Sequence, residues 1–401
     1  MKTRREFLGT SSAAVAAAPL QTGRAASSQS PPTSGKRIRL AVVGGGFGAT
    51  FLWHEHPHCE VVAVTDLHEA RRDRLRRQYR CDNAYNSFEE LLSRRQDLDA
   101  VAIFSDAPSH VKHVEMSFER GLHVCCAVPA CHTLEDAEKL KDMKQKTGLR
   151  YMMAESSYYR GGCIYARERF RNGDFGELFY SEIEYYHDLN IEKYLSNKKS
   201  LYWNPDGSAS WRQGWQPMHY PTHSLAYLVG VSGERISRVA CLGWADQQLL
   251  AKLESRSSAK TFFNQVALME TGQGHMVRCN EFRVAATDGI WVRAQWFGDR
   301  ASFYMAKRGY HGDVWHPRFG KPETIQLPEY WKSDQLTVQS GGHGGSAGFI
   351  CSEFINALVE DREPEIDLYE SLAMTVPGIV AHLSALKGGE QLKVPAFEKP
   401  A

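Results

Sequence analysis

The chain has 401 residues, of which 42% are hydrophobic and 24% charged, and its formal net charge is +1. This nearly neutral composition is typical of a soluble globular protein and argues against nucleic acid or a membrane surface as a partner. No apolar run reaches the roughly 18 to 20 residues that a membrane span needs. The length predicts two domains.

The N-terminus carries the features of a twin-arginine (Tat) export signal. Arg4-Arg5 precedes Phe7 and Leu8, a weakly apolar stretch of Ala and Ser follows, and small residues near Ala25 suit a cleavage site. Residues 1–35 are therefore predicted to be a signal peptide and linker. The Tat translocon is the expected partner during export, and the periplasm or another extracytoplasmic space the expected location. Because the Tat route carries folded proteins, a cofactor can be inserted before export.

Two groups of reactive side chains are predicted to be structural. The nine cysteines are odd in number and scattered, so we expect buried small hydrophobes rather than disulfides or a zinc ribbon. His54, His56 and His58 resemble a metal cluster, but Pro57 breaks the helical spacing that two ligands would need. A polar connecting turn is expected there, and no metal site is predicted.

A dinucleotide-binding fingerprint begins after the linker. Residues 38–43 form an apolar run that enters a glycine turn, in which Gly44, Gly46 and Ala49 occupy the three fingerprint positions. A helix is expected to follow and to direct its N-terminus at a pyrophosphate. Residues 61–65 form a second apolar strand that ends in Asp66, where a carboxylate accepts from ribose hydroxyls. The acid favours NAD over NADP, although Arg71 and Arg72 lie nearby.

Alternating strands and helices continue through the first half of the chain. Strands are expected at 99–104, 123–127 and 151–154, with a helix at 109–120, which predicts a doubly wound parallel sheet, a Rossmann domain, over residues 36–155. Residues 156–401 are assigned to a second domain. Its expected strands include 178–186, 238–244, 262–269 and 301–306, with a helix at 349–359. An exposed sheet face there could form a homo-oligomer, either a dimer or a tetramer.

The ordered motifs resemble the Gfo/Idh/MocA oxidoreductases, and among them the NAD-dependent glycosidases similar to α-N-acetylgalactosaminidases (glycoside hydrolase family 109). The segments that carry the likeness are Val128-Pro129-Ala130, Tyr185-Tyr186-His187-Asp188, Trp211-Arg212, Tyr220-Pro221-Thr222-His223 and Gly341-Gly342-His343-Gly344-Gly345. Val128 stands where other family members carry an acid/base lysine, and Ala127 replaces the usual Glu of the branch. The resemblance implies an α/β fold in which a C-terminal α+β domain with an open, mostly antiparallel sheet follows the Rossmann domain. Its C-terminal helix is expected to pack back on the first domain.

The resemblance also implies site residues. Tyr185 is the candidate base, and Tyr220 and His223 are candidates around the oxidised hydroxyl and the leaving group; a phenol needs a nearby positive charge for this role, whereas His titrates near neutrality. Substrate contacts are expected from Glu155, His187, Trp211, Arg212 and His343. Cofactor contacts are expected from Gly44, Gly46, Phe47, Gly48, Asp66, Ser105, His110, Val128 and Pro129.

Three functions remain open from the sequence. The first is net glycoside hydrolysis in which a sugar hydroxyl, expected at C3, is oxidised by tightly bound NAD and later reduced again. The second is a sugar dehydrogenase or a sugar–sugar oxidoreductase. The third is a non-catalytic sugar-binding protein on a former dehydrogenase scaffold.

Overall fold

The computed structural model describes Gly35 and residues 37–204, 206–253, 262–287, 289–332, 336–338 and 341–400, and Gly35–Ala401 forms one compact unit. The predicted Tat signal lies outside the described residues. Among the described residues, no helix is long and apolar enough to cross a bilayer.

The first sheet is fully parallel and has the strand order β3-β2-β1-β4-β5-β6. This is the Rossmann order, with β1 and β4 at the point where the order reverses. Its strands are continuous apolar runs because both faces are covered by other elements. The strands are β1 (Ile38–Val43), β2 (Cys59–Thr65), β3 (Ala84–Tyr85), β4 (Ala100–Ile103), β5 (His123–Cys126) and β6 (Tyr151–Met153).

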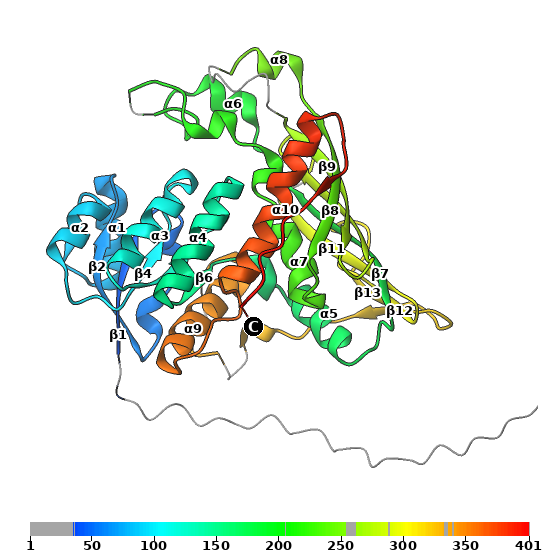
Figure 1. Ribbon diagram of the computed structural model, residues 1–401, viewed down its shortest axis with the longest axis horizontal. Coiled ribbons are helices and arrows are strands. Elements are labelled where there is room, and N and C mark those ends of the chain that lie inside the picture. Colours follow the sequence, from blue (N-terminus) through cyan, green and yellow to red (C-terminus); the bar gives the residue numbers. More distant parts are fainter. Residues whose placement is uncertain are drawn as a thin grey trace, which may run out of the picture. The chain divides into compact units, whose positions relative to one another are not determined.

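Helices accompany this sheet, and α3 and α4 lie side by side (Figure 1). Thr133 begins α4 by accepting from the N–H of Asp136, and Gly148 ends it in the left-handed conformation. The helices are α1 (Glu69–Tyr79), α2 (Phe88–Arg94), α3 (His110–Glu119) and α4 (Leu134–Thr147). The predicted doubly wound fold is confirmed, with small shifts at element ends.

The helix predicted directly after the glycine turn is wrong. The structure has only two short 3₁₀ turns there, Gly48–Thr50 and Trp53–Glu55. Phe51 and Trp53 are buried and stack at 5.8 Å, so the segment is held by its aromatic side chains instead of by an α-helical ladder. His56 is also buried and contacts Asn356 at 3.0 Å, which fixes the His-rich turn against a later helix.

The second sheet has nine strands in the order β14-β13-β12-β11-β7-β10-β9-β8-β15. It is antiparallel except for the pair of β7 with β10, which confirms an open, mostly antiparallel sheet. The strands are β7 (Leu178–Tyr186), β8 (Ile236–Trp244), β9 (Asn264–Thr271), β10 (Met276–Phe282), β11 (Trp291–Gly298), β12 (Ala301–Tyr304), β13 (Asp313–Pro317), β14 (Glu323–Ile325) and β15 (Leu392–Lys393).

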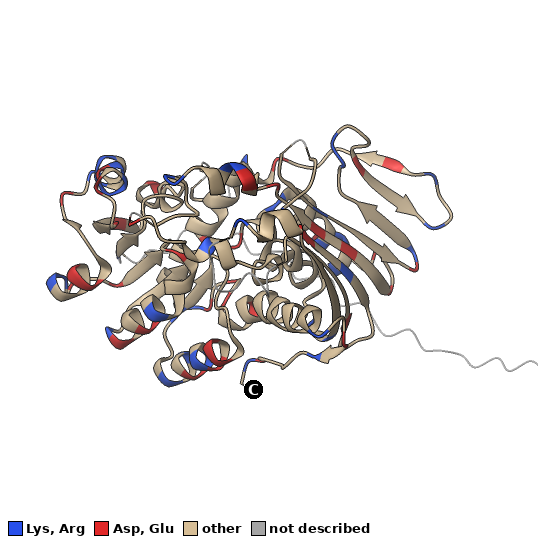
Figure 2. Cartoon of the chain, turned by 90° about the horizontal axis from the view of Figure 1, so that it is seen from above, with Lys and Arg blue, Asp and Glu red and all other residues tan. Residues whose placement is uncertain are grey.

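The two faces of this sheet differ. Charged pairs such as Arg293 with Glu184 and Arg278 with Glu182 join its central strands, where Figure 2 shows acidic and basic residues side by side. Five large apolar side chains on β8, β9 and β10 are exposed by 39% to 64%: Leu242, Trp244, Val266, Leu268 and Met276. The other face is covered by helices that include α5 (Gly161–Arg171) and α7 (Thr222–Ser232). The remaining short helices are α6 (Ile191–Ser196) and α8 (Gln247–Leu250).

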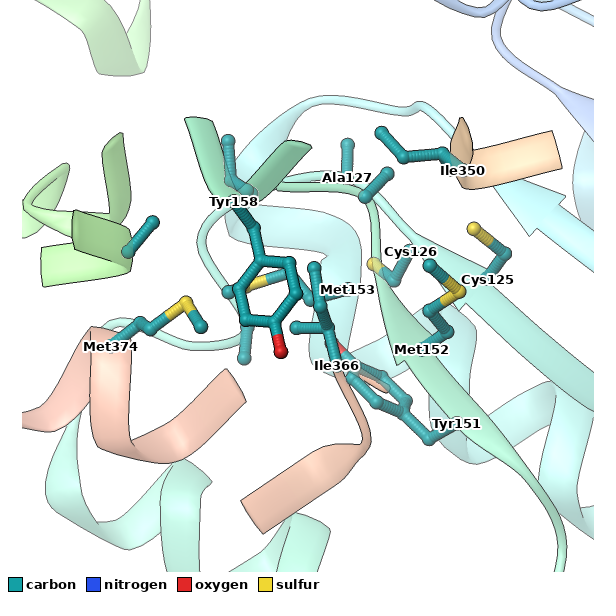
Figure 3. Close-up of a cluster of buried hydrophobic side chains, with 14 of the residues drawn as sticks. Cys125, Cys126, Ala127, Tyr151, Met152, Met153, Tyr158, Ile350, Ile366 and Met374 are labelled. Carbon is teal, nitrogen blue, oxygen red and sulfur yellow. The ribbon is translucent and has the colours of Figure 1, made fainter. Parts of the chain in front are cut away.

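Two C-terminal helices, α9 (Ser346–Val359) and α10 (Leu368–Leu386), join the domains. Helix α10 packs along β8 and also contacts α4 and β6 (Figure 1). The N–H of Met153 donates to the carbonyl of Ile366 at 3.0 Å, and Figure 3 shows Ile350, Ile366 and Met374 packed around the ends of β5 and β6. The exact domain boundary at residue 155 stays a prediction.

All nine cysteines are buried and free, as predicted from their spacing. Burial raises the pKa of Cys126 and Cys131 well above the usual range, which keeps these thiols protonated and unreactive. Within the described residues, no group of three or more His, Cys, Asp and Glu is placed to hold a metal ion.

Candidate active site

A cavity of about 750 Å³ lies at the carboxyl ends of β1, β2, β4 and β5 and extends to the second domain. Open α/β sheets place their ligands at this edge. The wall contains twelve of the predicted site residues: Gly44, Gly46, Phe47, Asp66, Ser105, His110, Val128, Tyr185, His187, Trp211, Arg212 and Tyr220. Five others, Gly48, Pro129, Glu155, His223 and His343, do not line it.

The structure constrains the glycines of the fingerprint in different ways. Gly44 has φ +97°, and a Cβ there would lie 2.3 Å from the carbonyl oxygen of Phe104. Gly48 packs against the ring of Phe104, with a Cβ position 2.8 Å away. At Gly46 a Cβ would meet only the guanidinium of Arg71, at 3.8 Å, so a side chain would occupy cavity space instead of colliding with the fold.

Asp66 ends β2 and holds the turn around the cavity. One carboxylate oxygen accepts from the N–H of Gly45 and the other from the N–H of His68, each at 2.7 Å. The side chain of Arg72 donates to the carbonyl of Asp66 at 2.8 Å. Asp66 therefore links the glycine turn to the start of α1, and its remaining lone pairs are available to a ligand in the cavity.

The loops after β4 and β5 form the opposite wall. The ring nitrogens of His110 lie 2.9 Å from the carbonyl oxygen of Pro129 and 3.1 Å from that of Ser105, so this buried imidazole ties the two loops together. Burial lowers the pKa of His110. Val128 lines the cavity and is 6% exposed, so the wall is apolar at this position.

These residues fit a dinucleotide. The turn has no side chain at Gly46, a carboxylate stands about 20 residues beyond it, and the wall at Phe47 and Val128 is apolar. The cavity volume is that of a cofactor-sized site. Gly44, Gly46, Asp66 and the loops after β4 and β5 are the groups that would hold NAD.

Tyr185 and His187 form the first hydrogen-bonded pair of the site. Both lie at the end of β7, and the Tyr185 hydroxyl oxygen is 2.8 Å from His187 Nδ1. Burial raises the pKa of Tyr185 to about 12, although Arg283 lowers it, and burial lowers the pKa of His187 to about 4. The phenol is therefore protonated and the imidazole neutral, so the hydroxyl donates and Nδ1 accepts.

His223 and Glu155 form the second pair. His223 is in the first turn of α7, and its Nδ1 lies 2.7 Å from Glu155 Oε1, which also accepts from the N–H of Ser157 at 2.7 Å. Burial raises the pKa of Glu155, but the charge and hydrogen bonds of His223 and Ser157 outweigh it and hold that pKa below its usual value. Glu155 is fully buried and does not line the cavity; it contacts His223 instead of facing the crevice as predicted.

The two pairs meet at the aromatic rings. The ring of His223 is 5.0 Å from the rings of both Tyr185 and Tyr220. Tyr220 lines the cavity, and burial raises its pKa. Three of the predicted residues, Tyr185, Tyr220 and His223, are thus brought into one cluster.

Arg283 was missed at the sequence level. Its guanidinium lies 4.9 Å from the ring centroid of Tyr185 and 5.8 Å from that of Tyr220, and it lines the cavity. Glu281 is fully buried beside it, accepts from the Ser224 hydroxyl at 2.5 Å, and has a pKa that burial raises to about 8 despite the attraction of Arg283. No motif of the sequence contains Arg283; the only signal was its place, with Glu281, at the end of β10.

The remaining predicted substrate residues are placed unequally. Arg212 lies 4.4 Å over the Trp211 ring and 3.8 Å from Asp106, across the cavity mouth. His343 is exposed, has φ +60°, and contacts Phe47 edge-on at 4.9 Å without lining the cavity. The start of α9 therefore supports the glycine turn from outside in this structure.

Two family models match the chain. The model described as the oxidoreductase family, NAD-binding Rossmann fold, matches residues 38–155, and the C-terminal domain of glycosyl hydrolase 109 matches residues 277–401. The first covers the glycine turn and Asp66, and the second covers Glu281, Arg283 and α9. The site thus defines a nicotinamide-binding enzyme of the Gfo/Idh/MocA class.

Curated relatives place the chain more narrowly. It is 30% identical over 458 residues to an α-N-acetylgalactosaminidase of Shewanella oneidensis, covering 99% of this chain and 96% of that one. It is 24% identical over 446 residues to a glycosyl hydrolase family 109 protein of Stenotrophomonas maltophilia, with 98% and 95% covered. The chain belongs to glycosyl hydrolase family 109.

Solved structures share the fold. An inositol dehydrogenase homologue of Azotobacter vinelandii, in complex with NADH and myo-inositol, superposes with a TM-score of 0.70 at 19% identity, covering 90% of this chain and 98% of that chain. An oxidoreductase domain protein of Kribbella flavida gives a TM-score of 0.71 at 18% identity, with 90% and 100% covered.

Proposed function

We propose that this protein is an exported, NAD-dependent glycosidase that hydrolyses its substrate through transient oxidation of a sugar hydroxyl, at C3. The observation that carries the proposal is that Tyr185 and His187 line the cavity, while His223, held by Glu155, packs its ring 5.0 Å from the Tyr185 ring. Simple dehydrogenation moves one proton. Elimination and addition require further transfers at the neighbouring carbon and at the leaving oxygen.

NAD held in the cavity would supply hydride acceptance and hydride return within one turnover. The chain itself moves the protons. His187 Nδ1 accepts the hydrogen bond of the Tyr185 hydroxyl, and the charge of Arg283 lowers the pKa of that phenol, so the phenolic oxygen is the group placed to take up the proton of the C–H next to the transient ketone. Glu155 holds His223 Nδ1, which leaves Nε2 to exchange a proton with the leaving oxygen or with the attacking water.

The proposed cycle causes no net oxidation or reduction of the substrate. Oxidation at C3 makes the proton at C2 acidic, and its removal expels the substituent at C1. Water then adds at C1, a proton returns to C2, and the carbonyl is reduced again. Export by the Tat route, with NAD preferred over NADP and retained tightly, suits such a cycle because no external cofactor pool is then required.

The test is hydrolysis of 4-nitrophenyl glycosides, including α-N-acetylgalactosaminide, in D₂O without added cofactor. We expect release of nitrophenol and a free, unoxidised sugar with one solvent deuterium at C2. Release of the phenol with no deuterium at carbon would exclude the oxidation and elimination route.

A sugar oxidoreductase is the second candidate, and the fold shared with the NADH-bound inositol dehydrogenase homologue favours it. Such an enzyme leaves an oxidised sugar among its products. Mass spectrometry of the same reaction separates the two functions, since an oxidised glycoside keeps its nitrophenyl group and is two hydrogens lighter than the substrate.

A further inference from the structure

A side cavity of about 230 Å³ adjoins the candidate active site. The two cavities share part of their walls, so a ligand in one touches side chains that also face the other. The shared residues are His187, Leu189, Leu201, Arg212, Trp215 and Arg283.

Polar groups are concentrated on the shared wall. His187, Arg212 and Arg283 are its ionisable members, whereas the residues that line only the side cavity are mostly apolar or aromatic. The amide of Gln213 is held by the carbonyl of Tyr202, at 2.9 Å. The apolar and aromatic residues beyond the shared wall are Ile191, Tyr194, Tyr202, Leu253, Phe262 and Phe263.

The wall combines a buried base with an exposed apolar rim. Ile191, Leu253 and Phe263 are buried, while Leu201 and Tyr194 are 55% and 39% exposed. The rings of Tyr194 and Tyr202 stack at 5.5 Å with an interplanar angle of 3°. Exposed apolar side chains around an aromatic-lined hollow mark a site that gains free energy when an apolar group covers them.

We propose that the side cavity is a leaving-group subsite that takes an aglycone with one aromatic ring. The proposal rests on the proposed glycosidase function, because only a bond-cleaving reaction has a leaving group. An apolar cavity of about 150 Å³ is enough for benzene, so this one holds a ring together with its linking atom. His187 and Arg283, which line both cavities, then lie beside the glycosidic oxygen that joins the sugar to the ring.

The first test compares benzyl and methyl glycosides of the sugar that the enzyme hydrolyses, because these two leaving alcohols differ little in acidity. Burying the ring should lower KM for the benzyl glycoside about tenfold to a hundredfold relative to the methyl glycoside. Tyr194→Ala removes one wall of the side cavity and Ile191→Trp fills its base. Each should abolish most of this difference and leave kcat for the methyl glycoside within about twofold. Tyr310→Ala, at a tyrosine that is 75% exposed and lines neither cavity, is the matched control.

Equal KM values in the wild type, or an unchanged benzyl preference in both variants, would overturn the subsite. Binding of 4-nitrophenol, a single-ring leaving group, followed by quenching of tryptophan fluorescence, gives a readout that needs no turnover. Saturable binding that Tyr194→Ala and Ile191→Trp weaken at least tenfold supports the subsite even if no glycoside is hydrolysed, in which case the proposed function alone fails. Nitrophenol binding that is absent, or equal in all variants, rejects the subsite whatever the activity.

Discussion

Replacing Glu155 by Gln tests the second proton-transfer pair directly. The carboxylate is fully buried, and one oxygen accepts from both His223 Nδ1 and the N–H of Ser157, each at 2.7 Å. Gln keeps the shape and an acceptor oxygen but removes the charge. A hydrogen bond to a charged group contributes about 1.5–3 kcal/mol. In the Gln variant, protonated His223 loses about this much stabilisation. The expected fall in kcat/KM is about tenfold to 150-fold.

The assay is kcat/KM on a 4-nitrophenyl glycoside across pH, together with NAD content and Tm. Glu353→Gln is the matched control: it alters a mostly buried carboxylate that pairs with Arg362 and lines no cavity. We expect that control to retain activity. If Glu155→Gln kept the wild-type rate with Tm unchanged, the assignment of His223 as an acid/base group would be refuted.

Three further predictions concern the cofactor turn, the buried charges and pH. Gly46→Ala should keep the wild-type Tm and lose NAD content on purification, whereas Gly44→Ala should lower both the Tm and the NAD content. At Gly44 the φ of +97° costs a residue with a side chain about 1–2 kcal/mol, and the Cβ would lie 2.3 Å from a carbonyl oxygen. Equal Tm values for the two variants would contradict this prediction. Above pH 8, where Glu281 is ionised, Arg283→Met should destabilise the protein by about 3–5 kcal/mol because it leaves that carboxylate unpaired. The loss should be smaller near pH 6, where Glu281 is protonated. Adding Glu281→Gln should recover most of the loss in denaturant unfolding at the higher pH; no recovery would mean that the pair is not coupled. Burial lowers the pKa of four histidines, His56, His113, His132 and His187, to about 4. Below pH 6.5 the unfolded chain therefore binds more protons than the folded one, so the free energy of unfolding should be at its maximum above about pH 6.5 and should fall as the pH drops to about 4. A flat profile in urea titrations over that interval would be inconsistent with neutral buried imidazoles.

The sequence predicted the sheet of the first domain well because its strands are buried on both faces and therefore read as unbroken apolar runs. The strand at 178–186 was also predicted with the bounds that the structure has. The prediction of a helix after the glycine turn was wrong, since the motif is shared by folds in which that segment is longer and helical. Local pattern could not reveal that Phe51 and Trp53 anchor the segment by stacking instead.

The site was harder to predict than the fold because its pairs depend on long-range contacts. Tyr185 and His187 are two residues apart, so their proximity follows from one strand, but Glu155 and His223 are separated by 68 positions. Their contact requires the end of β6 to meet the start of α7. The position of Arg283 over Tyr185 depends on the parallel pairing of β7 with β10, in which Tyr185 is opposite Glu281. The spacing of these residues along the sequence does not reveal that strand register.

The cofactor groups and the proton-transfer groups belong to different elements, so they can be changed separately. Gly44, Gly46 and Asp66 lie at the ends of β1 and β2, whereas Tyr185, His187 and His223 come from β7 and α7. A variant such as His187→Gln therefore leaves every predicted NAD contact in place while removing the acceptor for the Tyr185 proton. With the pKa of Tyr185 near 12, the phenol has no other described acceptor within hydrogen-bond distance. Turnover should then fall without loss of cofactor, the opposite pattern to Gly46→Ala, and a protein that lost both properties in either variant would not have the division of labour that this geometry implies.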